Sequence, residues 1–174
     1  MSTIKANSWK SLDDRVNNAF AQVVTTQKTT LQYIATTTFT DIMSVTITPR
    51  FSTSKVLVMV FLNFVASGHG SIKIYRNSTE LTEFEGEPYG SMTNCWTHEY
   101  GTGTYNTNGY NSRCHQGNFL DSPNTTSATT YTVKGGTPYS SSYWIGVNHN
   151  PMNRTDATWN YKVASCITAI EVLQ

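Results

Sequence analysis

The residues best suited to hold a metal ion lie in the middle of this 174-residue chain. Cys95 and His98 form a C-x2-H pair, and the adjacent residues Cys114 and His115 follow further along. Zinc prefers thiolate and imidazole ligands, but neighbouring residues of a strand point to opposite faces, and no second Cys-x2-Cys pair is present. We therefore expect a free thiol and polar loop histidines here, with no metal site.

The cysteines also bear on the redox environment. The chain has three, Cys95, Cys114 and Cys166, so they cannot all pair within one molecule. An odd set without a regular spacing is typical of a reducing compartment, whereas a Cys95–Cys114 bridge is the alternative that the sequence leaves open.

Three glutamates at alternate positions, Glu83, Glu85 and Glu87, could gather a calcium ion or supply a pair of catalytic carboxylates. If this segment is a strand, the three share one face, and the intervening Phe84 is the better candidate to point inward. We therefore expect solvent-exposed glutamates that repel one another, and leave open whether they bind an ion.

Nothing in the sequence indicates an enzyme that uses a nucleophile or a phosphate-binding loop. There is no G-x-S-x-G motif, and Gly101 and Gly103 are not followed by Lys-Ser/Thr. We expect a non-enzymatic protein without a cofactor.

The aromatic-rich stretch from Trp96 to Tyr110 is a better candidate for a binding site than these catalytic motifs. Tyrosine gives a large, rigid contact area, and the surrounding Asn, Thr and Gly add adaptable hydrogen bonds, as in binding loops. These rings either stack on surface sugars or pack within the protein or between subunits of an oligomer, and we favour packing. The candidate contact residues are Trp96, Tyr100, Tyr105 and Tyr110.

The charge balance limits the partners. Only 13% of residues are charged, and 12 basic against 11 acidic residues give a net charge of +1. This does not supply the basic surface that nucleic acid requires. The longest apolar run, 56–65, is interrupted by Asn63 and is too short to insert in a membrane.

Two regions are expected from the hydrophobic pattern. Residues 1–28 form an arm with a short helix over 12–22, capped by Ser11 and with apolar residues at helical spacing. The helix either packs on the protein's own body or anchors the chain to a neighbouring subunit. The candidate anchor residues are Trp9, Leu12, Val16 and Phe20.

Residues 29–174 are expected to form one all-β domain, an antiparallel sandwich like a jelly roll. Apolar residues alternate around Val45 and Ile47 and again at Ile72 and Ile74, whereas the run 55–65 indicates a strand buried on both faces. The segment 80–116 is too long for a loop, so it contains strands that the pattern does not place or an excursion used for contact.

Three segments resemble a short all-β module of tailed bacteriophages, found in fibre domains or as small virion proteins. Residues 119–135 read FLDSPNTTSATTYTVKG and predict a turn followed by a hairpin edge strand with Thr129, Tyr131 and Val133 on one face. The opening MSTIKAN and the pair SVTITP (44–49) and STSKVLV (52–58) are similar to the same module.

The resemblance implies a virion structural protein assembled in the host cytoplasm. Its expected role is capsid decoration, as a homotrimeric cement subunit bound to major capsid proteins. The alternative is a tail-fibre or adhesin domain that binds host glycans through the aromatic loop and contacts tail proteins.

Overall fold

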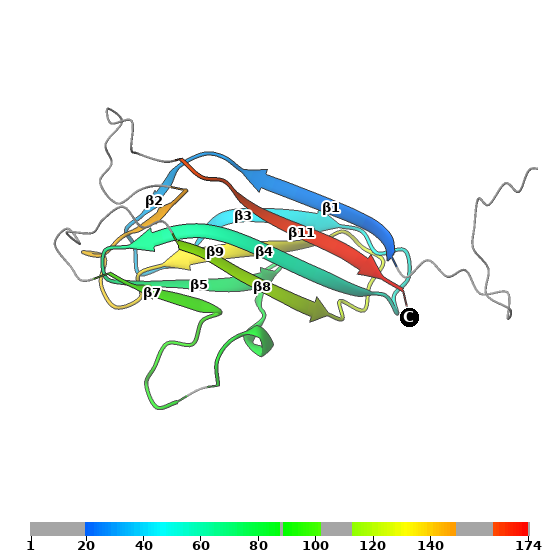
Figure 1. Cartoon of the computed structure of the whole chain (residues 1–174). Coiled ribbons are helices and arrows are strands. Elements are labelled where there is room, and N and C mark those ends of the chain that lie inside the picture. The colour runs from blue at the N-terminus through cyan, green and yellow to red at the C-terminus, as the bar shows by residue number, and fades with distance from the viewer. Residues whose placement is uncertain (1–19, 88, 102–112, 149–161, 174) are drawn as a thin grey trace, which may run out of the picture.

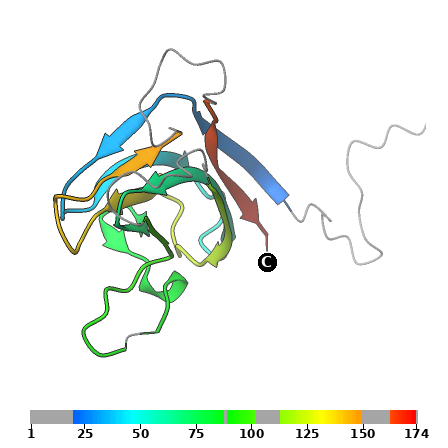
Figure 2. The same ribbon diagram turned by 60° about the vertical axis from the view of Figure 1, so that its left-hand side comes forward.

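The computed structural model describes residues 20–87, 89–101, 113–148 and 162–173. Two antiparallel sheets pack face to face (Figures 1 and 2), which confirms the predicted all-β sandwich. No helix in the described ranges is long and apolar enough to cross a membrane.

The first sheet has six strands and is centred on β4. Its strands are β1 (Phe20–Lys28), β2 (Gln32–Ile34), β4 (Lys55–Ala66), β8 (Arg113–Asp121), β10 (Ile145–Val147) and β11 (Ser165–Val172). Along one edge, β4 pairs with β11 over residues 55–61 and with β10 over residues 64–66. Its other edge pairs with β8. β1 lies outside β11, and β2 lies outside β10.

The second sheet has five strands. They are β3 (Thr40–Ile47), β5 (His69–Arg76), β6 (Thr79–Glu80), β7 (Thr97–Tyr100) and β9 (Thr129–Gly136). The order is β3-β9-β5, and β5 pairs at its other edge with β7 and β6.

The topology is that of a jelly roll. The four longest neighbours of one layer are β1-β11-β4-β8, and those of the other are β3-β9-β5-β7. Strands that follow one another in the chain thus mostly alternate between the layers, as in double-sheet jelly rolls. The jelly-roll-like sandwich predicted from the sequence is confirmed.

The core lies between the layers and follows strict alternation along each strand. On β4, every second residue is fully buried. These are Val56, Val58, Val60, Leu62 and Phe64. They face Ile72 and Ile74 of β5 and Tyr131 and Val133 of β9, which are equally buried. Each such side chain contributes about 1.5–3 kcal/mol through removal from water.

The expectation that β4 is buried on both faces is wrong. Leu57, Met59 and Phe61 point to the outer face of the six-stranded sheet and are partly exposed. A two-layer sandwich covers one face of each sheet only, and apolar residues at the outward positions conceal the alternation in the sequence.

The predicted hairpin edge is also corrected. Thr129, Tyr131 and Val133 do share one buried face, but β9 lies between β3 and β5 in the interior of its sheet. The hydrogen-bonding groups of this strand are therefore paired on both sides.

The N-terminal region begins in the sheet. Phe20–Lys28 is strand β1, so residues 20–22 are not helical, and the last nine residues of the predicted arm belong to the sandwich. Residues 1–19 lie outside the described ranges. A bulge between Phe20 and Gln22 marks the start of regular pairing with β11.

The segment 80–116 contains strand β7 and the start of β8, which the sequence pattern does not place. Between β6 and β7 the chain forms a short 3-10 helix, Thr82–Phe84, and a long connection that projects from the sandwich in both views (Figures 1 and 2). Residues 102–112 lie outside the described ranges.

Candidate functional site

Of the four aromatic contact candidates, Trp96 packs on the protein itself. It is half-buried, and its ring meets the edge of Phe119 at 5.6 Å between centroids. The indole lies directly over Gly117, where a Cβ would come within 2.6 Å of its nitrogen. For this residue the structure favours packing over ligand contact.

Tyr100 belongs to an exposed cluster of rings at one end of the sandwich, whereas Tyr105 and Tyr110 lie outside the described ranges. We call this group of rings the tyrosine–histidine cluster. Its members are His69, His98, Tyr100, Tyr139 and Tyr143. The His69 ring lies at its centre, with centroid distances of 4.8 Å to Tyr100, 5.1 Å to Tyr139 and 5.9 Å to Tyr143.

Strand register brings His69, His98 and Tyr100 together. His69 opens β5 and lies opposite Tyr100 of β7, while His98 lies opposite Ser71. All three therefore project from the outer face of the five-stranded sheet. The His69 Nδ1 and His98 Nε2 atoms are 3.3 Å apart and share a hydrogen bond.

The other two rings come from the loop after β9. Backbone hydrogen bonds from Ser140 to Thr137 and from Tyr143 to Ser140 fold this loop back over β5. A Cβ on Gly68 would lie 2.2 Å from the Tyr143 ring, so only glycine permits this close approach. The sequence pattern does not point to these two tyrosines, because they are distant from His69 and Tyr100 in the chain.

A second aromatic pair lies at the same end. Tyr33 of β2 stacks on Trp144, with centroids 5.5 Å apart. Ser67 fixes Trp144, because the Ser67 N–H donates to the Trp144 carbonyl and the Trp144 N–H donates to the Ser67 hydroxyl, each at 3.0 Å. Tyr33, Tyr100 and Tyr139 are 63%, 58% and 75% exposed.

This end of the molecule can bind a flat, hydroxyl-bearing ligand. Exposed tyrosine faces stack on apolar ring faces, and phenol and imidazole groups form hydrogen bonds at the rim. Partial burial and then the neighbouring His69 lower the pKa of His98, which keeps that imidazole neutral. The His98 ring is thus uncharged near neutral pH.

The alternate glutamates do not behave alike. Glu83 and Glu87 are exposed, as expected, and Phe84 stacks on Phe119 at 4.7 Å. Glu85 contradicts the expectation, since its side chain is only 1% exposed. Residues 82–84 form a 3-10 turn, so the two-residue period of a strand does not apply to them.

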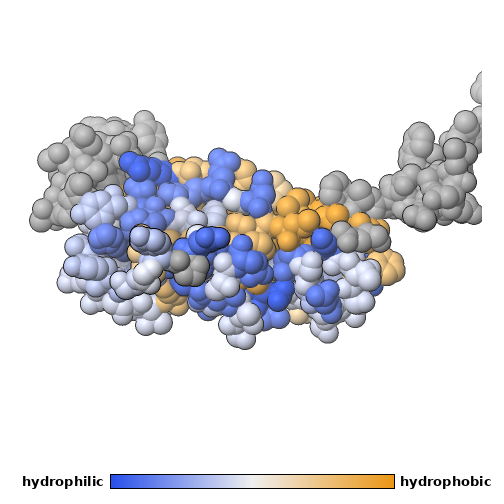
Figure 3. All heavy atoms as spheres, turned by 90° about the horizontal axis from the view of Figure 1, so that it is seen from below, coloured by the Kyte–Doolittle hydropathy of each residue, from blue (hydrophilic) through white to orange (hydrophobic). Residues whose placement is uncertain are grey.

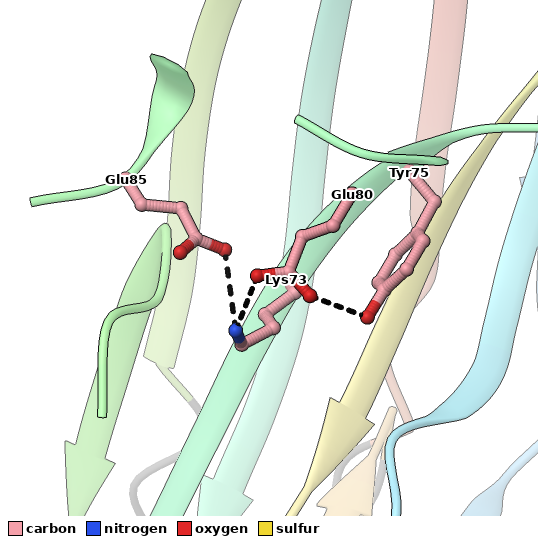
Figure 4. Close-up of polar contacts among 4 residues, drawn as sticks. All are labelled: Lys73, Tyr75, Glu80 and Glu85. Atoms are coloured by element: carbon pink, nitrogen blue, oxygen red, sulfur yellow. Dashed lines mark hydrogen bonds and ion pairs between the residues drawn. The ribbon is translucent and has the colours of Figure 1, made fainter. Parts of the chain in front are cut away.

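Glu85 is buried beside a cation, as Figure 4 shows. The Lys73 Nζ atom lies 3.7 Å from Glu85 and 2.5 Å from Glu80, and the Tyr75 hydroxyl donates to Glu80 at 2.7 Å. Burial raises the pKa of Glu85, although Lys73 opposes this. Glu85 thus holds the projecting segment beside Lys73 of the five-stranded sheet.

The four zinc-ligand candidates are dispersed. Cys114 lies on the outer face of β8 and His115 on its inner face, as alternation predicts. His115 shares a 2.8 Å hydrogen bond with Thr97, its ring packs on Phe64, and burial lowers its pKa. All three cysteines are free, and the described residues contain no cluster of three or more His, Cys, Asp or Glu arranged to hold a metal.

The anchor candidates are largely outside the described part of the chain. Trp9, Leu12 and Val16 fall in residues 1–19, and Phe20 opens β1 opposite Val172. The structure therefore places only the last of the four, at the edge of the six-stranded sheet.

A buried polar network between the sheets was not foreseen. Asp121 of β8 accepts hydrogen bonds of 2.6 Å from the Arg76 guanidinium and of 2.6 Å from the Tyr131 hydroxyl. The signal in the sequence was a lone aspartate ending the apolar run FLD, followed by a proline turn. This network joins the two layers and carries no ligand chemistry of its own.

Comparison with protein-family models gives no match for this chain, and comparison with curated protein sequences gives none either.

Proposed function

We propose that this chain is a non-enzymatic structural protein of a tailed-phage virion, a decoration subunit that binds the assembled capsid and stabilises it. The observation that supports this is where the phage-like segments lie in the fold. Segments 44–49 and 52–58 fall in or beside β3 and at the start of β4, and segment 119–135 spans the end of β8 and most of β9.

These segments pair with one another. β3 pairs with β9 in one layer, and β4 pairs with β8 in the other. These three segments thus lie side by side within both sheets, as parts of one module should, while the opening residues 1–7 lie outside the described ranges. The proposed partners are major capsid proteins and further copies of the chain in a homotrimer.

The experiment compares particles with and without this protein. Heating particles that lack it should release the packaged DNA at a lower temperature than heating complete particles. Adding the purified protein back should restore the difference. Equal stability of both particles, with no binding on add-back, contradicts the role in decoration.

A second candidate is an adhesin domain that binds host glycans, favoured by the exposed tyrosine–histidine cluster. The test is binding of the purified chain to host surface polysaccharide. Tyr100→Ala and Tyr139→Ala should each weaken binding if this function is correct, whereas Tyr89→Ala removes an exposed tyrosine outside the cluster and should not. Absence of binding by the unaltered chain rejects this candidate.

A further inference from the structure

The outer face of the six-stranded sheet is the apolar side of the molecule. Paired residues on neighbouring strands point to the same side, so the register of β1, β11, β4 and β8 defines rows across the sheet. One row is formed entirely by aliphatic side chains. Its members are Val23, Ile170, Leu57 and Leu120.

The next rows continue this apolar surface along β4. Met59 lies beside Thr168 and Asn118, and Phe61 lies beside Cys166 and Gln116. Val23, Leu120 and Phe61 are 61%, 51% and 38% exposed. In Figure 3, apolar side chains gather toward the right-hand end, where in Figure 1 β1 begins and β8 and β11 end.

Charge is almost missing from this face. Among the outward positions of the four strands, Lys55 is the one charged residue within the described ranges. The opposite outer face, on the five-stranded sheet, is different. It carries the ion pairs Lys134–Asp41 and Lys73–Glu80 and a Thr46–Thr130 hydrogen bond.

We propose that copies of this chain associate through the outer face of the six-stranded sheet, with the row Val23, Ile170, Leu57 and Leu120 at the centre of the contact. This rests on the proposed function only in that copies of the chain associate. The same face of two copies makes a two-fold contact, which joins chains in pairs and is separate from the contacts of the proposed homotrimer. Two nearly uncharged faces do not repel each other, and the largest apolar patch on a protein surface often marks an interaction site.

The dimensions of the face agree with self-association. Four strands about 4.8 Å apart and the stretch Lys55–Asn63 at about 3.3 Å per residue give a footprint of roughly 500–600 Å². Contact between two such faces would remove roughly 1,000 Å² from water, which reaches the lower bound of a specific interface.

The test measures the mass of the full chain in solution by sedimentation. The unaltered protein should sediment as an oligomer, and Leu120→Lys should weaken association about tenfold or more, because it places a charge in the apolar row. Ser44→Lys is the matched control, since it adds the same charge at an exposed position of β3 on the other outer face and should leave the mass unchanged.

Native thiols give a second readout. Cys166 lies on the proposed interface, whereas Cys95 is half-buried in the connection between β6 and β7, next to the outer face of the other sheet. Labelling of Cys166 with a maleimide should be slow in the oligomer and faster in the Leu120→Lys variant, while the rate at Cys95 stays the same. Far-UV circular dichroism should show that both variants keep the fold.

Three results would overturn the inference: a monomer at every concentration, an oligomer that Leu120→Lys does not weaken, or loss of association only when residues 1–19 are deleted. A monomer that still binds and stabilises particles would reject self-association while leaving the proposed role in the virion intact.

Discussion

Asp121 is a buried residue that links the two layers by hydrogen bonds. It is 4% exposed, and its partners Arg76 and Tyr131 come from the opposite sheet. A buried carboxylate with a cation and a hydroxyl in hydrogen-bonding distance is stable only while both partners are present. The geometry predicts an ordered ranking of variants.

Asp121→Ala should lower the free energy of unfolding by roughly 3–5 kcal/mol, because it leaves the Arg76 charge without its partner. Tyr131→Phe should cost less, about 1–3 kcal/mol, since the Arg76 pair remains and one acceptor oxygen loses its donor. Urea unfolding measures both. Equal, small effects would show that the network does not join the sheets.

Glu171 gives a prediction for pH. It is fully buried on β11 and accepts hydrogen bonds from the Arg50 N–H at 2.7 Å and from the Gln22 amide at 2.9 Å. Burial alone would raise the pKa of Glu171, but these donors outweigh it and the pKa lies below the ordinary 4.5.

A carboxylate with a lowered pKa stabilises the folded state above its ordinary pKa, and this contribution is lost as the pH falls through the lowered value. Stability should therefore decline as the pH drops below about 4.5, and Glu171→Gln should reduce that decline while lowering stability at neutral pH. Unfolding by urea at several pH values measures this. The same pH dependence in both proteins would contradict the assignment.

Among the elements, the connection between β6 and β7 is held in part by three side-chain contacts. Glu85 lies beside Lys73, Phe84 stacks on Phe119, and Trp96 covers Gly117. The segment projects from the sandwich. Loss of one of these contacts should therefore loosen the segment and leave the rest of the fold unchanged.

Lys73→Met should loosen this segment, because it leaves the buried Glu85 without a cation. Hydrogen exchange of residues 81–96 should become faster, while exchange in β4 and β9 stays the same. Adding Glu85→Gln to Lys73→Met should restore much of the protection, since the amide carries no charge. Faster exchange throughout the molecule would show that the lysine supports the whole sheet instead.

The elements differ in how well the sequence predicts them. Regular alternation at Ile72 and Ile74 predicts β5 correctly, and Asn77, with a left-handed φ of 54°, lies in the turn after it. Strand β7 was missed because it is short and its residues are polar or aromatic. Its position depends on pairing with β5, which no local pattern records.

The sequence predicts the candidate sites less well than it predicts the strands. Tyr100 is exposed in a ring cluster, but the tyrosines around it come from a loop that only the fold brings near. Trp96 has the same composition context and packs inward, because Gly117 leaves room for its ring. Residue type alone does not separate these two outcomes.

For the molecule as a whole, the two outer surfaces and the exposed end differ in chemistry. One outer face is apolar, the other is rich in threonine and ion pairs, and one end carries tyrosine and histidine rings. A jelly roll supports many functions, so the role depends on these surfaces and not on the fold. We propose that the apolar face mediates self-association and that the protein belongs to the virion shell.

The most direct test of the central claim is the copy number of this protein in purified virions, measured by quantitative mass spectrometry against the major capsid and tail proteins. A decoration subunit should be present in a fixed ratio to the major capsid protein and far above the tail proteins. Absence from the particles, or a number as low as that of the tail proteins, would contradict the claim.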